Sequence, residues 1–421
     1  MTTVNQPLKG SDREQRLVAA GLRRLTGWGP AVVSIALAVA YGLYIALRTY
    51  EVDLGVYLRL GGRYVFTSHL YSYVLPHTSL PFTYPPFAAL LFAPWQRTFG
   101  GVASVQAVWT MCNLAALVGV LVLSVRLVKP SLDKVATWRV ALALSLPALL
   151  LNPVLITIGF GQVNLFVTLL VMWDLLTERR IGTRQLPLGV ATGLAAAVKL
   201  TPLLFVPYLI LTRRWRGALT CVLTFAACEL VTFAVSPASS RAYWTKAIFK
   251  PSRAGDLSIV DNQNLWGVLD RITHGVLPDA VMLPLLLAAG AAGLLLAAQA
   301  HRRSSPLLGV LICAATCLIV SPISWVHHLV WVVPAILWLA LAPDRPRWGR
   351  VLAGATAVLF WSAPVWWVPY KNTSDLHLDA ADLLAGNSFF LALVLFLVGA
   401  AFLVLRRGSS GQPKTLHGSF S

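Results

Sequence analysis

Long apolar runs joined by short polar loops recur along the whole sequence, and they limit the folds that the chain can adopt. Four examples are 31–47, 114–127, 283–298 and 391–405. A helix needs roughly 20 apolar residues to cross the hydrocarbon layer, and fewer where neighbouring helices shield it. In lipid, each backbone polar group must be bonded within its own segment, so such runs form helices and not strands. The sequence therefore predicts an all-α, polytopic membrane helix bundle.

The charge pattern supports a membrane location. Only 12% of the 421 residues are charged and the mean hydropathy is +0.70, whereas a soluble domain carries about 25% charged residues. In a soluble protein the net charge of +18 would indicate nucleic-acid binding. Here the basic residues lie in short clusters between apolar runs, a pattern that orients membrane proteins and attracts anionic headgroups. We expect anionic membrane lipids as partners, and no nucleic acid.

Arginine and lysine residues in short loops predict the topology, because such loops stay in the cytoplasm. The predicted cytoplasmic segments are 1–24, 126–139, 179–184, 213–216, 302–303, 345–350 and the tail after 406–407. The predicted outer segments are 48–84, 152–164, 236–277, 321–324 and 370–387. This assignment predicts about twelve crossings with both termini in the cytoplasm. The outer loops carry short amphipathic stretches, 54–65 and 242–249, that are suited to the membrane interface.

Two details of this topology remain open. Keeping both 179–184 and 213–216 inside requires the chain between them to cross twice and to turn near Lys199-Leu-Thr-Pro202, where Pro202 favours a break. Residues 85–97 then form a juxtamembrane or re-entrant helix. The alternative makes 85–97 a full span and 186–211 one long helix, but it leaves two basic loops outside. We prefer the first topology.

The predicted domain organisation is simple. Residues 25–406 form one transmembrane domain, preceded by a cytoplasmic segment, 1–24, and followed by a disordered cytoplasmic tail, 407–421. The first apolar run lacks a small-residue cleavage site, so we expect it to be a retained anchor.

Asp53 is the first candidate for chemistry. It follows the first predicted span directly, at the outer membrane surface, between the apolar residues Val52 and Leu54. A carboxylate in such surroundings has a raised pKa and can accept a proton from a sugar hydroxyl. The alternative is an ordinary interfacial acid, like its neighbour Glu51.

Two adjacent histidines, His327 and His328, lie at the outer start of another helix, flanked by Trp325 and Trp331. Adjacent helical residues point about 100° apart, so at most one imidazole faces a given site and the other packs or hydrogen-bonds. A metal would need a second ligand pair at a suitable spacing, and the sequence offers none. We therefore expect no metal and no other cofactor.

Lys199 is the only lysine within an apolar stretch. At the outer turn of a broken helix, its ammonium can bind the phosphate of a lipid carrier as a point charge. The alternative is a lysine that snorkels to the interface.

Several uncharged polar residues on the outer side are candidate substrate-binding residues. The amides of Gln162, Asn164, Gln263 and Asn264 begin or adjoin helices, where they either cap those helices or hydrogen-bond sugar hydroxyls. Tyr84 is a further candidate substrate-binding residue. The two prolines that follow it have a mainly structural role, because they fix the start of the next segment.

The ordered set of these motifs resembles the actinobacterial polyprenol-phosphate-mannose-dependent mannosyltransferases, the PimE-like α-1,2-mannosyltransferases of the GT-C superfamily. The motifs that carry the resemblance are Val52-Asp-Leu-Gly-Val-Tyr57, Tyr84-Pro-Pro86, Gly161-Gln-Val-Asn164, Gly193-Leu-Ala-Ala-Ala-Val-Lys-Leu-Thr-Pro202, Asp261-Asn-Gln-Asn264 and Ser321-Pro-Ile-Ser-Trp-Val-His-His328.

The resemblance implies a GT-C fold and an inverting transferase of the plasma membrane whose active site faces the outer side. The implied donor is a β-mannosyl phosphopolyprenol and the implied product is α-linked. Asp53 matches the proposed base of the family, and His327 or His328 matches an assisting histidine. The implied acceptors are phosphatidylinositol mannosides, lipomannan or lipoarabinomannan.

Other functions stay open at this stage. A single strong carboxylate candidate, in place of the flanking pair of a typical hydrolase, favours one displacement with inversion. The sugar could instead be arabinofuranose or glucose on a lipid-phosphate donor. A twelve-helix secondary transporter is a different class, but such folds usually show internal repeats and a midplane site, and the polar groups here gather on the outer side. A scaffold subunit without activity would keep the fold and lose the chemistry.

Overall fold

The computed structural model describes residues 21, 24–48, 51–76, 78, 80–98, 102–178, 180–181, 183–369 and 378–409. Within these ranges the protein is helical, apart from two hairpins of two-residue strands. The hairpins pair β1 (Val74–Leu75) with β2 (Leu80–Pro81) and β3 (Arg180–Ile181) with β4 (Arg184–Gln185). Most of the predicted segment 1–24, the end of the predicted tail from 410 onward, and residues 370–377 of the last predicted outer segment lie outside the described residues.

Five helices in the described ranges are long and apolar enough to cross a membrane. They are α2 (Trp28–Arg48), α5 (Val102–Val128), α12 (Trp215–Val235), α15 (Asp279–Arg303) and α20 (Ser388–Ser409). The helices α8 (Asn152–Gly159) and α9 (Asn164–Leu176) are bent by 117° at a short break and give a sixth span if they are counted as one. The all-α, multi-pass prediction is confirmed, while the count of about twelve crossings stays a prediction.

Shorter helices complete the fold. In the segments between the long helices they are α3 (Val52–Gly55), η1 (Val56–Gly62), α4 (Pro86–Thr98), α13 (Pro237–Thr245), η3 (Ala247–Phe249), η4 (Pro251–Ala254), α14 (Leu265–Thr273), η6 (Pro364–Trp366) and α19 (Ala380–Gly386). Within the bundle they are α6 (Lys134–Ala143), α7 (Ser145–Leu149), α10 (Val190–Val198), η2 (Thr201–Leu204), α11 (Phe205–Leu211), α16 (Pro306–Val320), η5 (Val326–Trp331), α17 (Val332–Leu341) and α18 (Gly349–Ser362).

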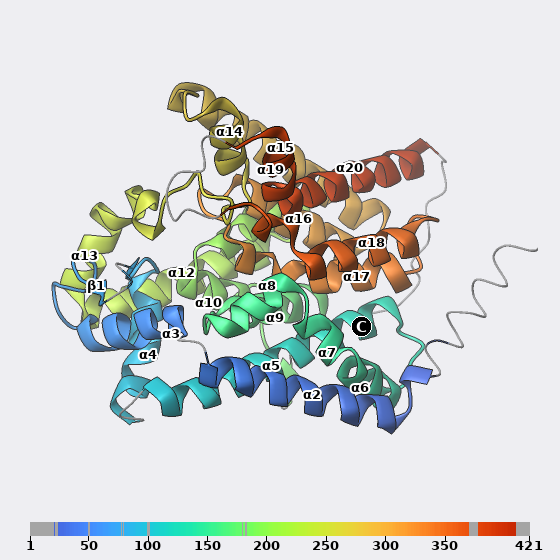
Figure 1. Cartoon of the computed structure of the whole chain (residues 1–421), viewed down its shortest axis with the longest axis horizontal. Helices are drawn as coiled ribbons and strands as arrows, with labels where there is room; N and C mark the ends of the chain where they lie inside the picture. The colour runs from blue at the N-terminus through green and yellow to red at the C-terminus, as the bar shows by residue number, and fades with distance from the viewer. Residues whose placement is uncertain are drawn as a thin grey trace, which may run out of the picture.

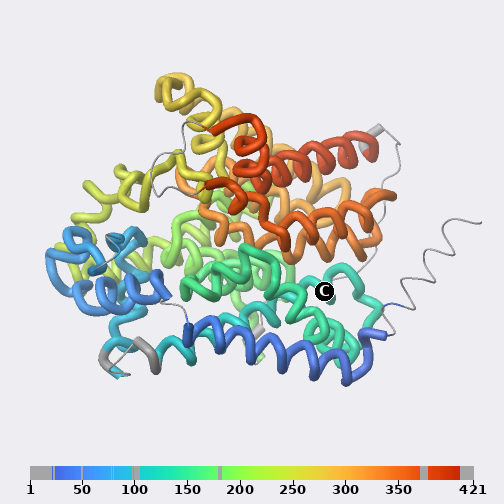
Figure 2. The backbone as a smooth tube through the Cα atoms, in the orientation of Figure 1, coloured from blue at the N-terminus to red at the C-terminus, as the bar shows by residue number. Residues whose placement is uncertain are grey.

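The bent pair α8–α9 occupies the centre of the bundle. The N-terminal helices α2 and α5 lie on one side of it, and the C-terminal helices α17, α18 and α20 lie on the other (Figures 1 and 2). Helix α8 contacts α2, α18 and η5, and α9 contacts α5, α10, α16 and η5. The bend therefore lies where the two halves of the chain meet.

The outer segment after α2 differs from the prediction. The stretch 54–65 was expected to lie in the membrane interface, but the apolar side chains of Leu54, Val56 and Leu58 are buried inside the protein, and η1 packs on α4. Helix α4 has 13 residues and is about 20 Å long. It is too short to cross roughly 30 Å of hydrocarbon, which agrees with a juxtamembrane or re-entrant helix at 85–97.

The predicted break at Lys199 is confirmed. Helix α10 ends at Val198, Lys199 is extended with φ −149° and ψ 125°, and η2 contains Pro202 in its first turn. Helices α10 and α11 both pack on α12. They have 9 and 7 residues, so each is shorter than a full span. The predicted double crossing of this segment therefore stays a prediction.

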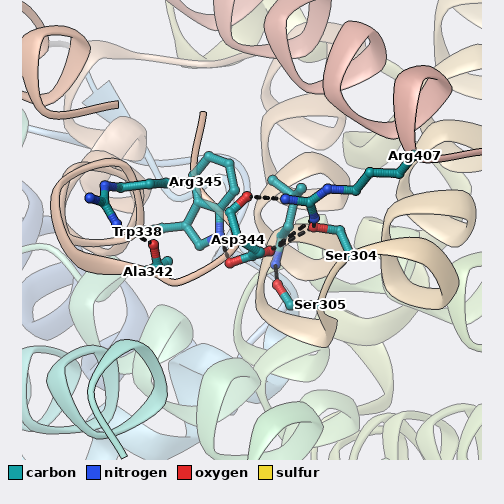
Figure 3. Close-up of polar contacts among 8 residues, drawn as sticks. Ser304, Ser305, Trp338, Ala342, Asp344, Arg345 and Arg407 are labelled. Carbon is teal, nitrogen blue, oxygen red and sulfur yellow. Dashed lines mark hydrogen bonds and ion pairs between the residues drawn. The ribbon is translucent and has the colours of Figure 1, made fainter. Parts of the chain in front are cut away.

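A polar cluster holds the ends of three helices together (Figure 3). The carboxylate of Asp344, just after α17, accepts hydrogen bonds from Ser304 Oγ (2.6 Å) and Trp338 Nε1 (3.1 Å). Arg407 of α20 donates to Ser304 Oγ and to the Asp344 carbonyl and approaches the Asp344 carboxylate at 3.9 Å. These bonds fix α17, α20 and the end of α15 relative to one another.

We predict that Gly189→Ala destabilises the bundle. Gly189 begins α10 with φ +100°, and an added Cβ would lie 2.1 Å from the Gly217 carbonyl oxygen. Strain of this kind costs on the order of 1–3 kcal/mol. Thermal unfolding in detergent should therefore show a lower Tm for this variant. Gly354→Ala is the control, because its Cβ meets nothing within 4 Å, and its Tm should be unchanged or higher. Equal Tm values would contradict the close packing of α10 on α12.

Candidate active site

The backbone of Asp53 is attached to the bend between α8 and α9. The N–H groups of Asp53 and Leu54 both donate to the carbonyl of Phe160, at 3.0 and 3.1 Å. The next residue, Gly161, has φ +69°, and a Cβ there would lie 2.6 Å from Leu54 Cβ and 2.7 Å from Glu51 Oε2. Only glycine fits this position, because the approach is close and the backbone is left-handed.

The side chain of Gln162 connects three other residues. Its Oε1 accepts from Tyr57 Oη at 2.9 Å, and its Nε2 lies 3.0 Å from Tyr84 Oη. Its amide also hydrogen-bonds the Asp53 carboxylate. Gln162 is buried and Asp53 is partly exposed. Asp53, Tyr57, Tyr84 and Gln162 therefore form one polar cluster, which we call the Gln162 cluster.

Lys199 joins this cluster from the end of α10. Its Nζ donates to Asn164 Oδ1 at 2.7 Å and lies 5.6 Å from the centre of the Tyr84 ring. Asn164 Nδ2 in turn donates to the His327 carbonyl at 2.8 Å, as does Thr157 Oγ1. In the described part of the chain Lys199 makes no ion pair, so a neutral amide holds its ammonium and leaves its charge available to a ligand.

The two histidines take different positions, as the sequence predicted for adjacent helical residues. The ring of His327 packs edge-on against Phe160, with 5.7 Å between centroids. The ring of His328 hydrogen-bonds the backbone carbonyl of Ile323, and its Nδ1 has no partner among the described residues. Both ring nitrogens of His327 also lack a partner there.

Two cavities share the side chain of Trp331. A small one of about 30 Å³ is lined by Lys199, His328, Asn164 and Trp331, among others. A large apolar groove of about 1600 Å³ lies between α16, α17, α18 and α20, and Trp331 lines it as well. Other groove residues are Leu311, Leu329, Ala335, Leu359, Phe396 and Gly399. The groove therefore adjoins the cavity that contains Lys199 and His328, and Trp331 lines both.

Comparison with known proteins identifies the family. Residues 82–322, more than half of the chain, match glycosyltransferase family 87. The chain belongs to this family. The match includes Tyr84, Gln162, Asn164 and Lys199, while Asp53 lies before it. This family 87 protein is therefore a glycosyltransferase, and the transporter interpretation is not supported.

Curated relatives cover most of the chain. One is a polyprenol-phosphate-mannose-dependent alpha-(1-2)-phosphatidylinositol pentamannoside mannosyltransferase of Mycobacterium tuberculosis (strain CDC 1551 / Oshkosh), 33% identical over 352 residues, or 82% of this chain and 79% of the relative. Another is a polyprenol-phosphate-mannose-dependent alpha-(1-2)-phosphatidylinositol mannoside mannosyltransferase of Mycolicibacterium smegmatis (strain ATCC 700084 / mc(2)155), 32% identical over 398 residues, or 88% of each chain. No solved structure matches significantly.

Asp53 has the properties of a general base for glycosyl transfer. Burial raises its pKa to about 6, while the hydrogen bond from Gln162 and the positive charge of Lys199 oppose that rise. A carboxylate with this pKa is mostly ionised at neutral pH and binds a proton more readily than an ordinary aspartate. It is therefore suited to accept the proton of an attacking hydroxyl.

Gln263 and Asn264 do not join the Gln162 cluster. Gln263 Nε2 donates to the Gly386 carbonyl at 2.6 Å, and its Oε1 accepts from Phe390 N at 2.8 Å. Asn264 caps α14 and donates to the Ser321 carbonyl at 2.5 Å. The capping alternative thus describes Asn264, and sugar binding by these two residues stays a prediction.

Sequence reasoning missed two acids near the site. Glu51, interpreted as an ordinary interfacial acid, is fully buried, and its Oε1 accepts from Thr110 at 2.9 Å. Burial raises its pKa to about 8, so it carries a proton at neutral pH. Asp261 accepts a hydrogen bond from Val326 N at 2.9 Å. Burial raises its pKa to about 6, with a smaller contribution from the charge of Asp53. The Asp261-Asn-Gln-Asn264 motif pointed to this loop, but only the amides of Gln263 and Asn264 were predicted to be binding residues, and the carboxylate of Asp261 was not.

We predict that the rate of glycosyl transfer falls at acidic pH. The base must be ionised, so kcat/KM should drop about tenfold per unit as the pH falls below about 6, the raised pKa of Asp53. A pH–rate profile measured from pH 4.5 to 8 checks this. An acidic limb near pH 4, the ordinary pKa of an aspartate, would contradict the buried position of the base.

Proposed function

We propose that the protein transfers mannose from polyprenyl-phosphate-mannose to a mannolipid acceptor, with inversion and formation of an α-1,2 linkage. The acceptor is a phosphatidylinositol mannoside or a glycan built on one, such as lipomannan or lipoarabinomannan. The activities by which the relatives are named support the donor, the linkage and the acceptor class. The observation that carries the proposal is the convergence of Asp53 and Lys199, far apart in sequence, on Gln162, Asn164 and Tyr84.

The proposed reaction is one displacement. The acceptor hydroxyl oxygen bonds to the anomeric carbon while the bond from that carbon to the phosphate oxygen breaks. The hydroxyl proton goes to Asp53, and the electron pair of the broken bond leaves with the phosphate. Lys199 stabilises the charge that develops on the phosphate, and His328, which lines the same cavity, is placed to assist.

We propose that the apolar groove binds the polyprenyl chain of the donor. Residues from Ser388 to Arg406 of α20 line it, which corresponds to about 27 Å of helix. Trp348, Trp367 and Leu395 at its edges are 59%, 68% and 70% exposed, so lipid can enter from the side. A chain in this groove has its phosphate end beside Trp331, next to the cavity that Lys199 lines.

We also propose that the reaction faces the outer side of the plasma membrane, with both termini in the cytoplasm. The clusters of basic residues in the predicted cytoplasmic loops support this orientation. The reaction needs no divalent cation in this proposal, because the ammonium of Lys199 supplies the positive charge at the phosphate.

We predict that purified protein transfers radiolabelled mannose from polyprenyl-phosphate-mannose to phosphatidylinositol mannosides in the presence of EDTA. Asp53→Asn should lower kcat at least about 100-fold, because the base is lost while shape is kept. Asp279→Asn, an exposed outer acid, is the control and should keep full activity.

Three outcomes would change the proposal. Transfer from arabinofuranosyl or glucosyl donors alone would replace the sugar. Activity that EDTA abolishes and a divalent cation restores would contradict the role of Lys199. Wild-type activity in a folded Asp53→Asn variant would remove the proposed base.

We predict that Gly399→Phe raises the KM for a long-chain donor. Gly399 lines the groove, and a Cβ there meets nothing within 4 Å, so the ring fills the groove without strain on the backbone. Gly354→Phe is the matched control, because its Cβ is equally free but it does not line the groove. A donor with a two-isoprene chain should show the same KM in all three proteins. An unchanged KM for the long donor in Gly399→Phe would place the chain elsewhere.

A further inference from the structure

Asp261 lies in a loop that pairs with the segment leading to the two histidines. Asn262 and Trp325 form an antiparallel bridge. Gln263 N donates to the Ser324 carbonyl at 2.8 Å, and Ser324 N donates to Asn262 Oδ1 at 2.9 Å. Two residue stretches, 261–263 and 324–326, therefore run side by side, directly before η5.

The side chain of Asp261 completes this pairing. Its Oδ1 accepts the hydrogen bond from Val326 N at 2.9 Å, and Val326 is the first residue of η5, which carries His327 and His328. At the start of a helix a backbone N–H has no partner within the helix. Asp261 thus fixes the position from which both histidines project.

The same part of the protein contacts the loop of Asp53. The Phe160 carbonyl binds the backbone of Asp53, and the Phe160 ring contacts the ring of His327. The loop of Asp53 and the turn that carries the two histidines therefore meet at Phe160. Burial raises the pKa of Asp261 to about 6, and the negative charge of Asp53 makes a smaller contribution to that rise.

The second carboxylate oxygen of Asp261 is not used by the fold. In the described part of the chain its Oδ2 has no hydrogen-bond partner, and the side chain is partly exposed. The nearest cation that influences it, Arg271, binds the carbonyls of Ser258, Ile259 and Asn262 and the amide of Asn387. A neutral asparagine would serve the Val326 bond equally well, so packing alone does not explain a negative charge here.

We propose that Asp261 is a positioning residue for the transfer reaction, whose Oδ1 holds the turn that carries His327 and His328 and whose negative charge makes Asp53 a stronger base. This inference rests on the proposed function. During the displacement the acceptor proton moves to Asp53, and a second negative charge close by favours that transfer. Because the two acids interact, they titrate as a pair.

Other charged or titratable groups also face this pair. Asp53 interacts with Lys199 from the end of α10, with Tyr57 from η1 and with Tyr84 before α4. Asp261 interacts with Asp53 and with Arg271 of α14. His327 and His328 are both influenced by Lys199. A neutral substitution at 261 changes only one member of this set.

We predict that Asp261→Asn shifts the acidic limb of kcat/KM to lower pH by about half a unit or more, because Asp53 loses a neighbouring negative charge. At neutral pH, kcat should fall several-fold, while the KM for the donor stays within about twofold. Asp261→Glu keeps the charge but alters the bond to Val326, so its acidic limb should stay at the wild-type position. Asp279→Asn removes a distant outer acid and should leave both kcat and the limb unchanged.

The outcomes separate the inference from the proposed function. An acidic limb at the wild-type pH in Asp261→Asn, with unchanged kcat, would overturn the inference even though transfer occurs. A loss of kcat in the Glu variant alone, with no shift of the limb in either variant, would reduce Asp261 to a structural bond. Absence of transfer by the wild-type protein with every donor would instead refute the proposed function. Thermal unfolding of each variant shows whether it is folded, and Asp261→Gln, compared with Asp261→Glu, provides the charge test if the Asn variant is not.

Discussion

The structure depends on the bend between α8 and α9, where one carbonyl and two amides hold three distant parts of the chain. The Phe160 carbonyl accepts the backbone N–H groups that begin the Asp53 helix. Gln162 connects to Tyr57 and Tyr84, and Asn164 connects Lys199 to the His327 backbone. Buried polar groups are stable only when they are bonded, so satisfying the backbone at this bend also assembles the side chains of the site.

Burying a lysine without an ion pair costs free energy in a membrane protein, but here it leaves the ammonium available to an anionic ligand. Lys199 is 8% exposed and is held by the neutral Asn164 amide, so an anionic ligand gains the full attraction of the ammonium. Its cavity and the apolar groove share Trp331. Trp331 thus lies between a cavity suited to a charged headgroup and a groove suited to a hydrocarbon chain, which is the arrangement that a lipid-phosphate donor requires.

Much of the fold and of the candidate site could be predicted from the sequence, because polar residues in apolar surroundings cost free energy and therefore stand out in the sequence. The helical class, the break at Lys199 and the shared site of Asp53, Gln162, Asn164 and Lys199 followed from that argument. The role of Asp261 did not, because the pairing of 261–263 with 324–326 is a tertiary contact without a local signal. The same reason explains why Glu51 was taken for an interfacial acid and why 54–65 was expected at the membrane surface. Helices such as α10 and α11 are too short for the apolar-length rule, so crossings could not be counted from hydropathy alone.

The most direct test of the account is a cryo-electron microscopy structure of the protein with polyprenyl phosphate bound. The account predicts that the phosphate lies within hydrogen-bond distance of Lys199 Nζ, with the prenyl chain along α20 in the apolar groove and the carboxylate of Asp53 facing the space above the phosphate. A phosphate bound beside Arg347 or Arg406, which also line the groove, with no density near Lys199, would contradict it.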